Sequence, residues 1–261
     1  MDKLIVVKIG GNIIDDDEKL STFLTHFASI EGFKILVHGG GKLATRLAEA
    51  LSIPQQLVEG RRITDAETLK VVTMVYAGYI NKTIVAKLQA LDCNALGLTG
   101  ADGASINAHE RINNGMDYGF VGDVDEINTT LFQSFLQQGI TPVLAPITAD
   151  KFGQLLNTNA DTIAQEIAKE LSAFYETSLV YSFEKEGVLL DTADEASVIP
   201  NLSAAYYNEL KSSGAIYAGM LPKLDNAFAA LQAGVSKVII GKGENLDNLI
   251  AGTSGTQIIN D

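Results

Sequence analysis

The sequence predicts an α/β sandwich with buried parallel strands, and three observations support this fold class. Short apolar runs rich in β-branched residues recur along the chain, and each ends at glycine, proline or asparagine. Longer segments with the apolar period of a helix lie between these runs. The chain has 261 residues, of which 46% are hydrophobic, so it can form one large domain or two closely joined domains around a well-buried core.

The strands and helices alternate along most of the chain. The predicted strands cover residues 4–11, 34–41, 95–103, 141–147, 178–183 and 236–243. The predicted helices cover residues 16–31, 42–51, 65–91, 128–138, 160–171, 203–212 and 222–233. Because each strand is followed by a helix, we expect neighbouring strands to run parallel and the helices to cover the sheet.

Two stretches interrupt this alternation, residues 106–128 and 153–162, and both combine turn-forming residues with short alternating pieces. We predict that the first is a β-hairpin insertion. No linker rich in proline, glycine or serine separates the two halves of the chain. We therefore expect two lobes that share one continuous sheet, with a boundary near residue 150.

The composition excludes several classes of function. The formal net charge is −13 and the pI is near 4.6, which argues against nucleic-acid or anionic-membrane partners. A single cysteine, Cys93, cannot form an internal disulfide, and the sequence starts without an export signal. No apolar run is long enough to suggest a membrane span. A cytoplasmic location is the expectation.

Three consecutive glycines end the second predicted strand. A Walker A loop requires serine or threonine after its lysine, but Leu43 follows Lys42, so that motif is excluded. The dinucleotide fingerprint is formally met by Gly39, Gly41 and Ala44. A plain tight turn from strand to helix is the structural alternative, and this segment alone leaves both open.

The first strand ends in a similar way, with Lys8 two residues before Gly10 and Gly11. Glycine pairs let backbone N–H groups approach an anion closely, and the helix that follows adds the positive end of its dipole. A lysine within an Ile/Val strand is costly to bury unless it is paired or bound to an anion. Lys8 therefore points to an anionic ligand, with a solvent-directed strand-end lysine as the alternative.

Other polar residues interrupt the apolar pattern. Arg61 and Arg62 lie in a predicted loop, where a guanidinium could grip a carboxylate. Asn157, Asn159 and Asp161 share one face if their segment is extended, although Asp161 could also be the N-cap of the next helix. Lys223 falls in the first turn of a helix, where it opposes the helix dipole. The three histidines, His26, His38 and His109, are too scattered to suggest a metal site.

Five segments, taken together and in order, resemble the amino-acid kinase family: KIGGN, VHGGG, GRRIT, LNTNAD and GMLPK. The resemblance spans most of the chain and is strongest to members that act on an N-acylated glutamate. It implies a three-layer sandwich with an open, mainly parallel central sheet. It also implies an N-terminal lobe, residues 1–150, for acyl-glutamate binding and dimerisation, and a C-terminal lobe, residues 151–261, for ATP binding.

The resemblance also implies roles for individual residues. The catalytic residues would be Lys8 and Lys223, which neutralise the transferred phosphoryl group, and Asp161, which holds both lysines in place. The substrate-binding residues would be Gly40, Gly41, Arg62, Asn157 and Asn159. The phosphate- and nucleotide-binding residues would be Gly10, Gly11, Glu184, Gly187, Ala215, Ile216, Tyr217 and Gly219, with no metal ligand from a protein side chain.

One motif departs from the family pattern. The usual S-D-V-x-G-[VI]-L is here FEKEGVL, so Glu184 stands for the aspartate and Phe183 for the small residue. The departure affects the expected contacts to the base and ribose more than those to the phosphates.

The function that the resemblance implies is phosphorylation of the γ-carboxylate of N-acetyl-L-glutamate in arginine biosynthesis, with ATP and Mg²⁺. The same reaction on N-succinyl-L-glutamate is an alternative. A non-catalytic amino-acid sensor of the same fold is a second, and an NAD-dependent oxidoreductase, which rests on the glycine fingerprint alone, is a third.

The resemblance finally implies a homodimer without feedback by arginine, because only Met1 and Asp2 precede the first strand and the inhibited relatives carry a helix there. The dimer interface is expected in the helical segment 65–91. Its apolar positions Leu69, Val72, Val75 and Tyr76 form a stripe, for which packing in the core is the alternative to an interface.

Overall fold

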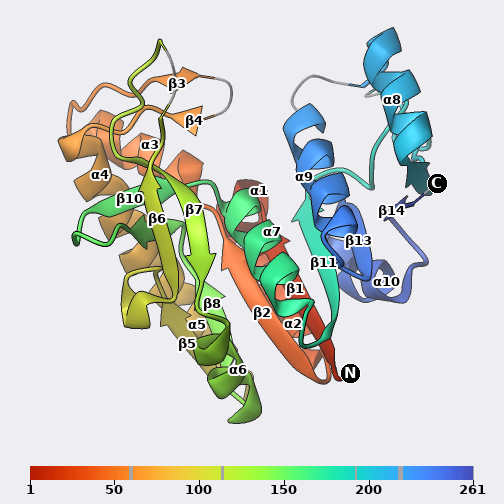
Figure 1. Cartoon of the computed structure of the whole chain (residues 1–261), viewed down its shortest axis with the longest axis horizontal. Coiled ribbons are helices and arrows are strands. Elements are labelled where there is room, and N and C mark those ends of the chain that lie inside the picture. The colour runs from red at the N-terminus through yellow and green to blue at the C-terminus, as the bar shows by residue number, and fades with distance from the viewer. Residues whose placement is uncertain (59–60, 113–114, 192, 217–219, 261) are drawn as a thin grey trace. The chain divides into compact units, whose positions relative to one another are not determined.

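The computed structural model describes residues 1–58, 61–112, 115–191, 193–216 and 220–260. These residues form two compact units (Figure 1). The first unit contains residues 1–34 and 164–261, and the second contains residues 35–163. The first strand of the chain therefore belongs to the same unit as the C-terminal part of the chain. The two predicted lobes, which meet near residue 150, are defined by what each is expected to bind, and they remain a prediction.

Strands and helices alternate along much of the chain, as predicted. The strands are β1 (Lys3–Ile9), β2 (Phe33–His38), β3 (Leu57–Val58), β4 (Arg61–Arg62), β5 (Ala95–Leu98), β6 (Ile106–Glu110), β7 (Val121–Ile127), β8 (Thr141–Leu144), β9 (Ile147–Ala149), β10 (Leu155–Thr158), β11 (Glu176–Phe183), β12 (Asn201–Ser203), β13 (Lys237–Lys242) and β14 (Thr256–Ile259). The α-helices are α1 (Gly11–Ile14), α2 (Asp17–Ser29), α3 (Gly41–Ala50), α4 (Ala66–Thr73), α5 (Asn81–Gln89), α6 (Thr129–Gln137), α7 (Ala160–Leu171), α8 (Ala204–Ser213), α9 (Leu221–Gln232) and α10 (Leu246–Ala251). A π-helix, η1 (Met74–Ile80), joins α4 to α5, and short 3₁₀ turns cover η2 (Asp102–Ala104) and η4 (Gly243–Asn245). The alternation is not complete, because β6 and β7 follow each other directly, and so do β8, β9 and β10.

The first unit is organised around β1 and β11. These strands are parallel, with Lys8 opposite Tyr181, and β11 is also parallel to β13. The edge differs from the prediction, because β14 runs antiparallel to β13 and parallel to β12. Most residues of β1 and β13 are buried, as expected for strands that read as continuous apolar runs.

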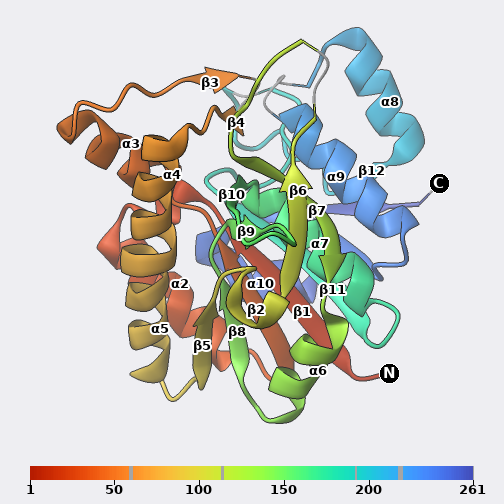
Figure 2. The same cartoon turned by 60° about the vertical axis from the view of Figure 1, so that its left-hand side comes forward.

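The second unit contains two sets of strands. In the first set, β8 is paired in parallel with β2 and with β5. In the second set, β6, β7, β9 and β10 close into a small barrel, in which β6 and β7 are antiparallel (Figure 2). The predicted hairpin insertion at residues 106–128 is therefore confirmed, as is the mixed α/β class with mainly parallel strands.

The predicted helix at residues 65–91 is present but is divided into α4, η1 and α5. Its expected interface stripe is not on the surface, since the four residues concerned lie in the core of the unit: Leu69, Val72, Val75 and Tyr76. The large apolar side chains that are exposed in this segment are instead Met74 and Tyr79 of η1, with 56% and 68% of their surface accessible, and Leu91. None of the helices in the described part of the chain is long and apolar enough to cross a membrane.

Candidate active site

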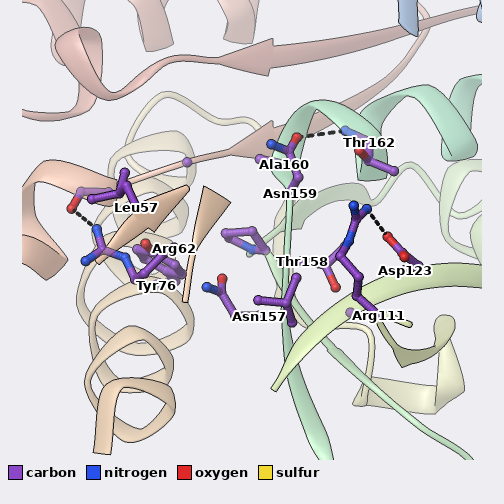
Figure 3. Close-up of a pocket in the computed structure, with 16 residues that line it drawn as sticks. Leu57, Arg62, Tyr76, Arg111, Asp123, Asn157, Thr158, Asn159, Ala160 and Thr162 are labelled. Carbon is purple, nitrogen blue, oxygen red and sulfur yellow. Dashed lines mark hydrogen bonds and ion pairs between the residues drawn. The ribbon is translucent and has the colours of Figure 1, made fainter. Parts of the chain in front are cut away.

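A pocket of about 170 Å³ lies within the second unit, where the glycine loop meets the barrel strands (Figure 3). It is lined by Gly39, Gly40, Gly41, Leu57, Arg62, Tyr76, Arg111, Val121, Gly122, Asp123, Pro146, Asn157, Thr158, Asn159, Ala160 and Thr162. All five residues that the resemblance assigned to substrate binding line it. Their roles in binding stay a prediction, but their gathering in one cavity supports it.

The glycine loop forms the floor of the pocket between β2 and α3. Gly40 is the N-cap of α3 and has a φ of +145°, a conformation that side chains with a Cβ rarely adopt. A Cβ on Gly40 would lie 2.2 Å from Cδ1 of Ile80. Among the described residues no side chain caps α3 at Gly40, and the backbone N–H groups of the first turn lie at the positive end of the helix dipole, which favours an anionic ligand.

A buried histidine supports this loop from behind. The Nδ1–H of His38 donates to the carbonyl of Gly39 at 2.8 Å, and Nδ2 of Asn81 donates to Nε2 at 3.1 Å. Burial lowers the pKa of His38 to about 4 against the opposing effect of the Gly39 hydrogen bond, so the ring is neutral at neutral pH. The His38–Asn81 pair therefore fixes the carbonyl at the start of the glycine loop.

Arg62 forms one wall of the pocket and is buried. Its Nη2 donates to the carbonyl of Gly41 at 3.0 Å and to Oγ1 of Thr45 at 2.8 Å, and its Nη1 donates to Gln55. Burial raises the pKa of Tyr76, and the Arg62 guanidinium acts against that rise. Arg62 is therefore held firmly against α3, with its charge in the cavity.

The opposite part of the pocket comes from β10 and the start of α7. Nδ2 of Asn157 donates to Oγ1 of Thr64 at 3.0 Å. Oδ1 of Asn159 accepts from the N–H groups of Asp161 and Thr162 at 2.8 and 3.1 Å. Asn159 is thus the N-cap of α7, and the reading of Asp161 as the cap is wrong. Asp161 lies in the first turn of the helix, at the positive end of the helix dipole.

The predicted phosphoryl-handling residues at the end of β1 belong to the first unit. Lys8 is buried, with 8% of its surface accessible, and it is the second-last residue of β1. The N–H of Gly10 donates to the carbonyl of Ser182 at 3.1 Å, and Gly11 begins α1. Asn12 of α1 donates to the carboxylate of Glu184, which is the residue that departs from the family motif.

The other predicted nucleotide residues also lie in the first unit. Lys223 is in the first turn of α9, as predicted. Ile216 is buried, whereas Ala215 is exposed. Gly187 has a packing role of its own, since a Cβ there would lie 2.7 Å from Oγ1 of Thr256. Tyr217 and Gly219 lie outside the described residues.

Two charged residues of the pocket were missed by the sequence analysis, Arg111 and Asp123. They form an ion pair across β6 and β7. Their only signal in the sequence was their place in the predicted hairpin, because a lone arginine after a strand reads as a solvated charge. Across the described residues, no group of three His, Cys, Asp or Glu side chains could hold a metal ion.

Comparison with known proteins gives a consistent result. The profile described as "Amino acid kinase family" matches residues 3–242. A protein of Cytophaga hutchinsonii named acetylglutamate kinase is 55% identical over 262 residues, covering 99% of each chain. One of Parabacteroides distasonis with the same name is 54% identical over 246 residues, covering 94% of this chain and 96% of that protein.

A solved structure is similar in fold as well. It is N-acetylglutamate synthase from Neisseria gonorrhoeae complexed with coenzyme A and N-acetyl-glutamate, with a TM-score of 0.84. It is 20% identical, and the match covers 100% of this chain and 60% of that one. At this identity the likeness concerns the fold alone.

Proposed function

The chain belongs to the amino acid kinase family, and from this premise we propose that it phosphorylates the γ-carboxylate of N-acetyl-L-glutamate with ATP in arginine biosynthesis. Family membership supports ATP as the phosphoryl donor, and the shared name of the most similar relatives supports the acceptor. The observation that carries the proposal is the pocket in which the glycine loop, Arg62 and Asn157 meet.

The chemistry needs no general base. A γ-carboxyl group has a pKa of about 4.3, so it is an anion at neutral pH and can attack phosphorus directly. One carboxylate oxygen forms a bond to the γ-phosphorus of ATP, and the bond from that phosphorus to the β,γ-bridging oxygen breaks. ADP leaves with the bonding electron pair, and the product is an acyl phosphate. The main barrier is repulsion between two anions.

The pocket provides groups for the acceptor. Arg62 presents a fixed cation, which suits the α-carboxylate of an acylated glutamate. The uncapped N-terminus of α3 adds N–H donors next to it. Asn157 keeps one amide N–H beyond its bond to Thr64. Together these groups would fix the substrate by its α-carboxylate and leave the γ-carboxylate to react.

The phosphoryl-transfer groups in this proposal are Lys8, Lys223 and Asp161, with Gly10, Gly11, Glu184, Gly187, Ala215, Ile216, Tyr217 and Gly219 for the phosphates and nucleotide. Lys8 is buried near the end of β1, and Lys223 lies in the first turn of α9, where a cation can meet an anionic phosphoryl group. Mg²⁺, when bound, neutralises charge on the phosphates. Its ligands would include phosphate oxygens and water, as is usual for Mg²⁺ at nucleotide phosphates.

The experiment that tests the proposal measures ADP release and traps the acyl phosphate with hydroxylamine as a hydroxamate. N-acetyl-L-glutamate is expected to give equal amounts of ADP and hydroxamate. N-acetyl-L-glutamine is the matched control, because it lacks only the γ-carboxylate, and it should give neither. Binding of N-acetyl-L-glutamate without any hydroxamate would contradict the proposal and favour the sensor function.

The homodimer belongs to this proposal too. Met74 and Tyr79 of η1 are exposed, and so are Leu47 and Leu51 of α3 and Leu96 of β5. All five belong to the second unit. Exposed apolar side chains can form an interaction site, and a second copy of the chain is the partner that we propose for them. The cytoplasmic location expected from the composition remains a proposal that cell fractionation would test.

A further inference from the structure

The substrate pocket contains a second arginine that the proposed contacts do not use. Arg111 follows β6, and Figure 3 shows it on the other side of Asn157 from Arg62. Arg62 already provides the cation for the α-carboxylate of the substrate. A second cation in a cavity of this size would contact a different part of the ligand or would exclude some ligands.

Arg111 is held in place by the barrel. Its backbone N–H donates to the carbonyl of Val121 at 2.7 Å, and its guanidinium lies 6.0 Å from the centre of the Tyr118 ring. Its Nη2 donates to the carboxylate of Asp123. Among the described residues neither Nη1 nor Nε has an acceptor, and Nε is buried. The guanidinium is thus fixed along one edge and has N–H donors to spare.

The shape of an acylated glutamate leaves one group for this arginine. Its α-carbon carries a hydrogen, the α-carboxylate, the side chain with the reacting carboxylate, and the acylated nitrogen. Under the proposed function, Arg62 binds the α-carboxylate, and the γ-carboxylate must be open to the phosphoryl donor. The acylated nitrogen remains, and Arg111 with Asp123 is the remaining charged part of the pocket wall.

We propose that Arg111 is a specificity-determining residue that distinguishes an acylated α-nitrogen from a free one. It donates from Nη1 to an oxygen of the acyl group, whereas the ammonium group of unacylated L-glutamate has only donors and cannot accept this hydrogen bond. A ligand that leaves the Nη1–H without an acceptor is disfavoured, so the site discriminates by a hydrogen bond that only the acylated ligand can make. The oxygen is either the amide carbonyl, present in every N-acyl-glutamate, or the terminal carboxylate of an N-succinyl group.

The inference rests on the proposed function, and binding measurements keep the two separate. Isothermal titration calorimetry of the full chain gives Kd for N-acetyl-L-glutamate, N-succinyl-L-glutamate and L-glutamate. The wild-type protein is compared with Arg111→Gln and Arg111→Lys. Arg46→Gln is the matched control, because Arg46 is exposed on α3 and does not line the pocket.

We expect Arg111→Gln to reduce the preference for the better acylated ligand over L-glutamate at least tenfold, and Arg46→Gln to leave it unchanged. Arg111→Lys should lie between them, because it keeps the charge but changes the donor geometry. A loss confined to N-succinyl-L-glutamate identifies the terminal carboxylate as the oxygen, and a loss for both ligands identifies the amide carbonyl. If both Arg111 variants keep the wild-type preference within twofold, the inference is wrong, even if all affinities fall together. If the wild-type protein binds neither acylated ligand, the proposed function itself fails.

Discussion

Arg62 donates hydrogen bonds to Gln55, Gly41 and Thr45, so the protein itself holds the guanidinium in place. A lysine ammonium cannot reproduce this planar, many-pointed geometry. We expect Arg62→Lys to raise KM for N-acetyl-L-glutamate about tenfold or more, as the loss of one charged hydrogen bond would. KM for ATP should change little. Steady-state kinetics with each substrate varied in turn would measure both, and a larger effect on ATP would contradict the assignment.

Lys8 and Lys223 are expected to act on charge that develops during phosphoryl transfer. Lys8→Ala and Lys223→Ala should therefore each lower kcat by about 100-fold or more while changing KM far less. Lys3→Ala is the matched control, because Lys3 lies at the exposed start of the same strand as Lys8. Near-normal kcat in either site variant would remove that lysine from the mechanism.

His38 should make the stability of the protein depend on pH. Burial lowers its pKa to about 4 from the ordinary value of 6.5, so the unfolded chain binds a proton more readily than the folded one. Above pH 6.5 the ring is neutral in both the folded and the unfolded protein, so His38 costs no stability there. As the pH falls from 6.5 towards 4, the unfolded chain takes up a proton that the folded protein does not, and stability is lost. The shift corresponds to a loss of about 3 kcal/mol.

The variant His38→Gln cannot ionise, so its free energy of unfolding should fall less steeply between pH 6.5 and 4 than that of the wild-type protein. Urea denaturation at several pH values would measure both slopes. His109→Gln removes an exposed histidine and should keep the loss that His38 causes. Equal slopes for the wild type and His38→Gln would show that His38 is not the source.

At the scale of single elements, the glycine loop tolerates almost no change. Gly40→Ala forces a Cβ onto a φ of +145° and within 2.2 Å of Ile80, so we expect a loss of about 1–3 kcal/mol in stability, with weaker substrate binding. Gly115→Ala is the matched control, because Gly115 has a φ of +120° but open space around it. It isolates the backbone strain, and thermal unfolding should show a smaller loss for it.

Most elements could be predicted from the sequence, because the buried faces of helices and strands leave a periodic apolar pattern. The prediction failed where more than one residue could fill the same structural role. Asn159 and Asp161 are both good caps, and propensity alone does not choose between them. The hydrogen bonds to Asn159 decide the matter. Similarly, residues 65–91 carry one continuous helical pattern, and nothing in that pattern shows the wider π turns of η1.

The candidate site shows the same limit. Residues in glycine-rich or Asn/Asp segments stood out from an apolar background and do line the pocket, as Gly40 and Asn157 show. Arg111 and Asp123 did not stand out, because their importance depends on a cross-strand ion pair. A sequence read without its pairing register does not reveal which charges meet.

At the scale of the whole molecule, the exposed apolar side chains of the second unit predict self-association. We expect light scattering to give the mass of a dimer. Tyr79→Asp should shift the protein towards monomer, since it places a charge on an apolar surface. Phe152→Asp is the control, because Phe152 is also exposed but belongs to the turn between β9 and β10 and not to η1. A hexamer, or a dimer insensitive to Tyr79→Asp, would contradict the proposed interface.

The division of the chain into two units also affects the order in which they can fold during synthesis. The second unit is one uninterrupted segment, residues 35–163, whereas the first is assembled from both ends of the chain. β1 leaves the ribosome early, but its partner β11 is made more than 160 residues later. The acceptor pocket can therefore form during translation, as domains often do. The strand that carries Lys8 must wait, unpaired with β11, until most of the protein exists.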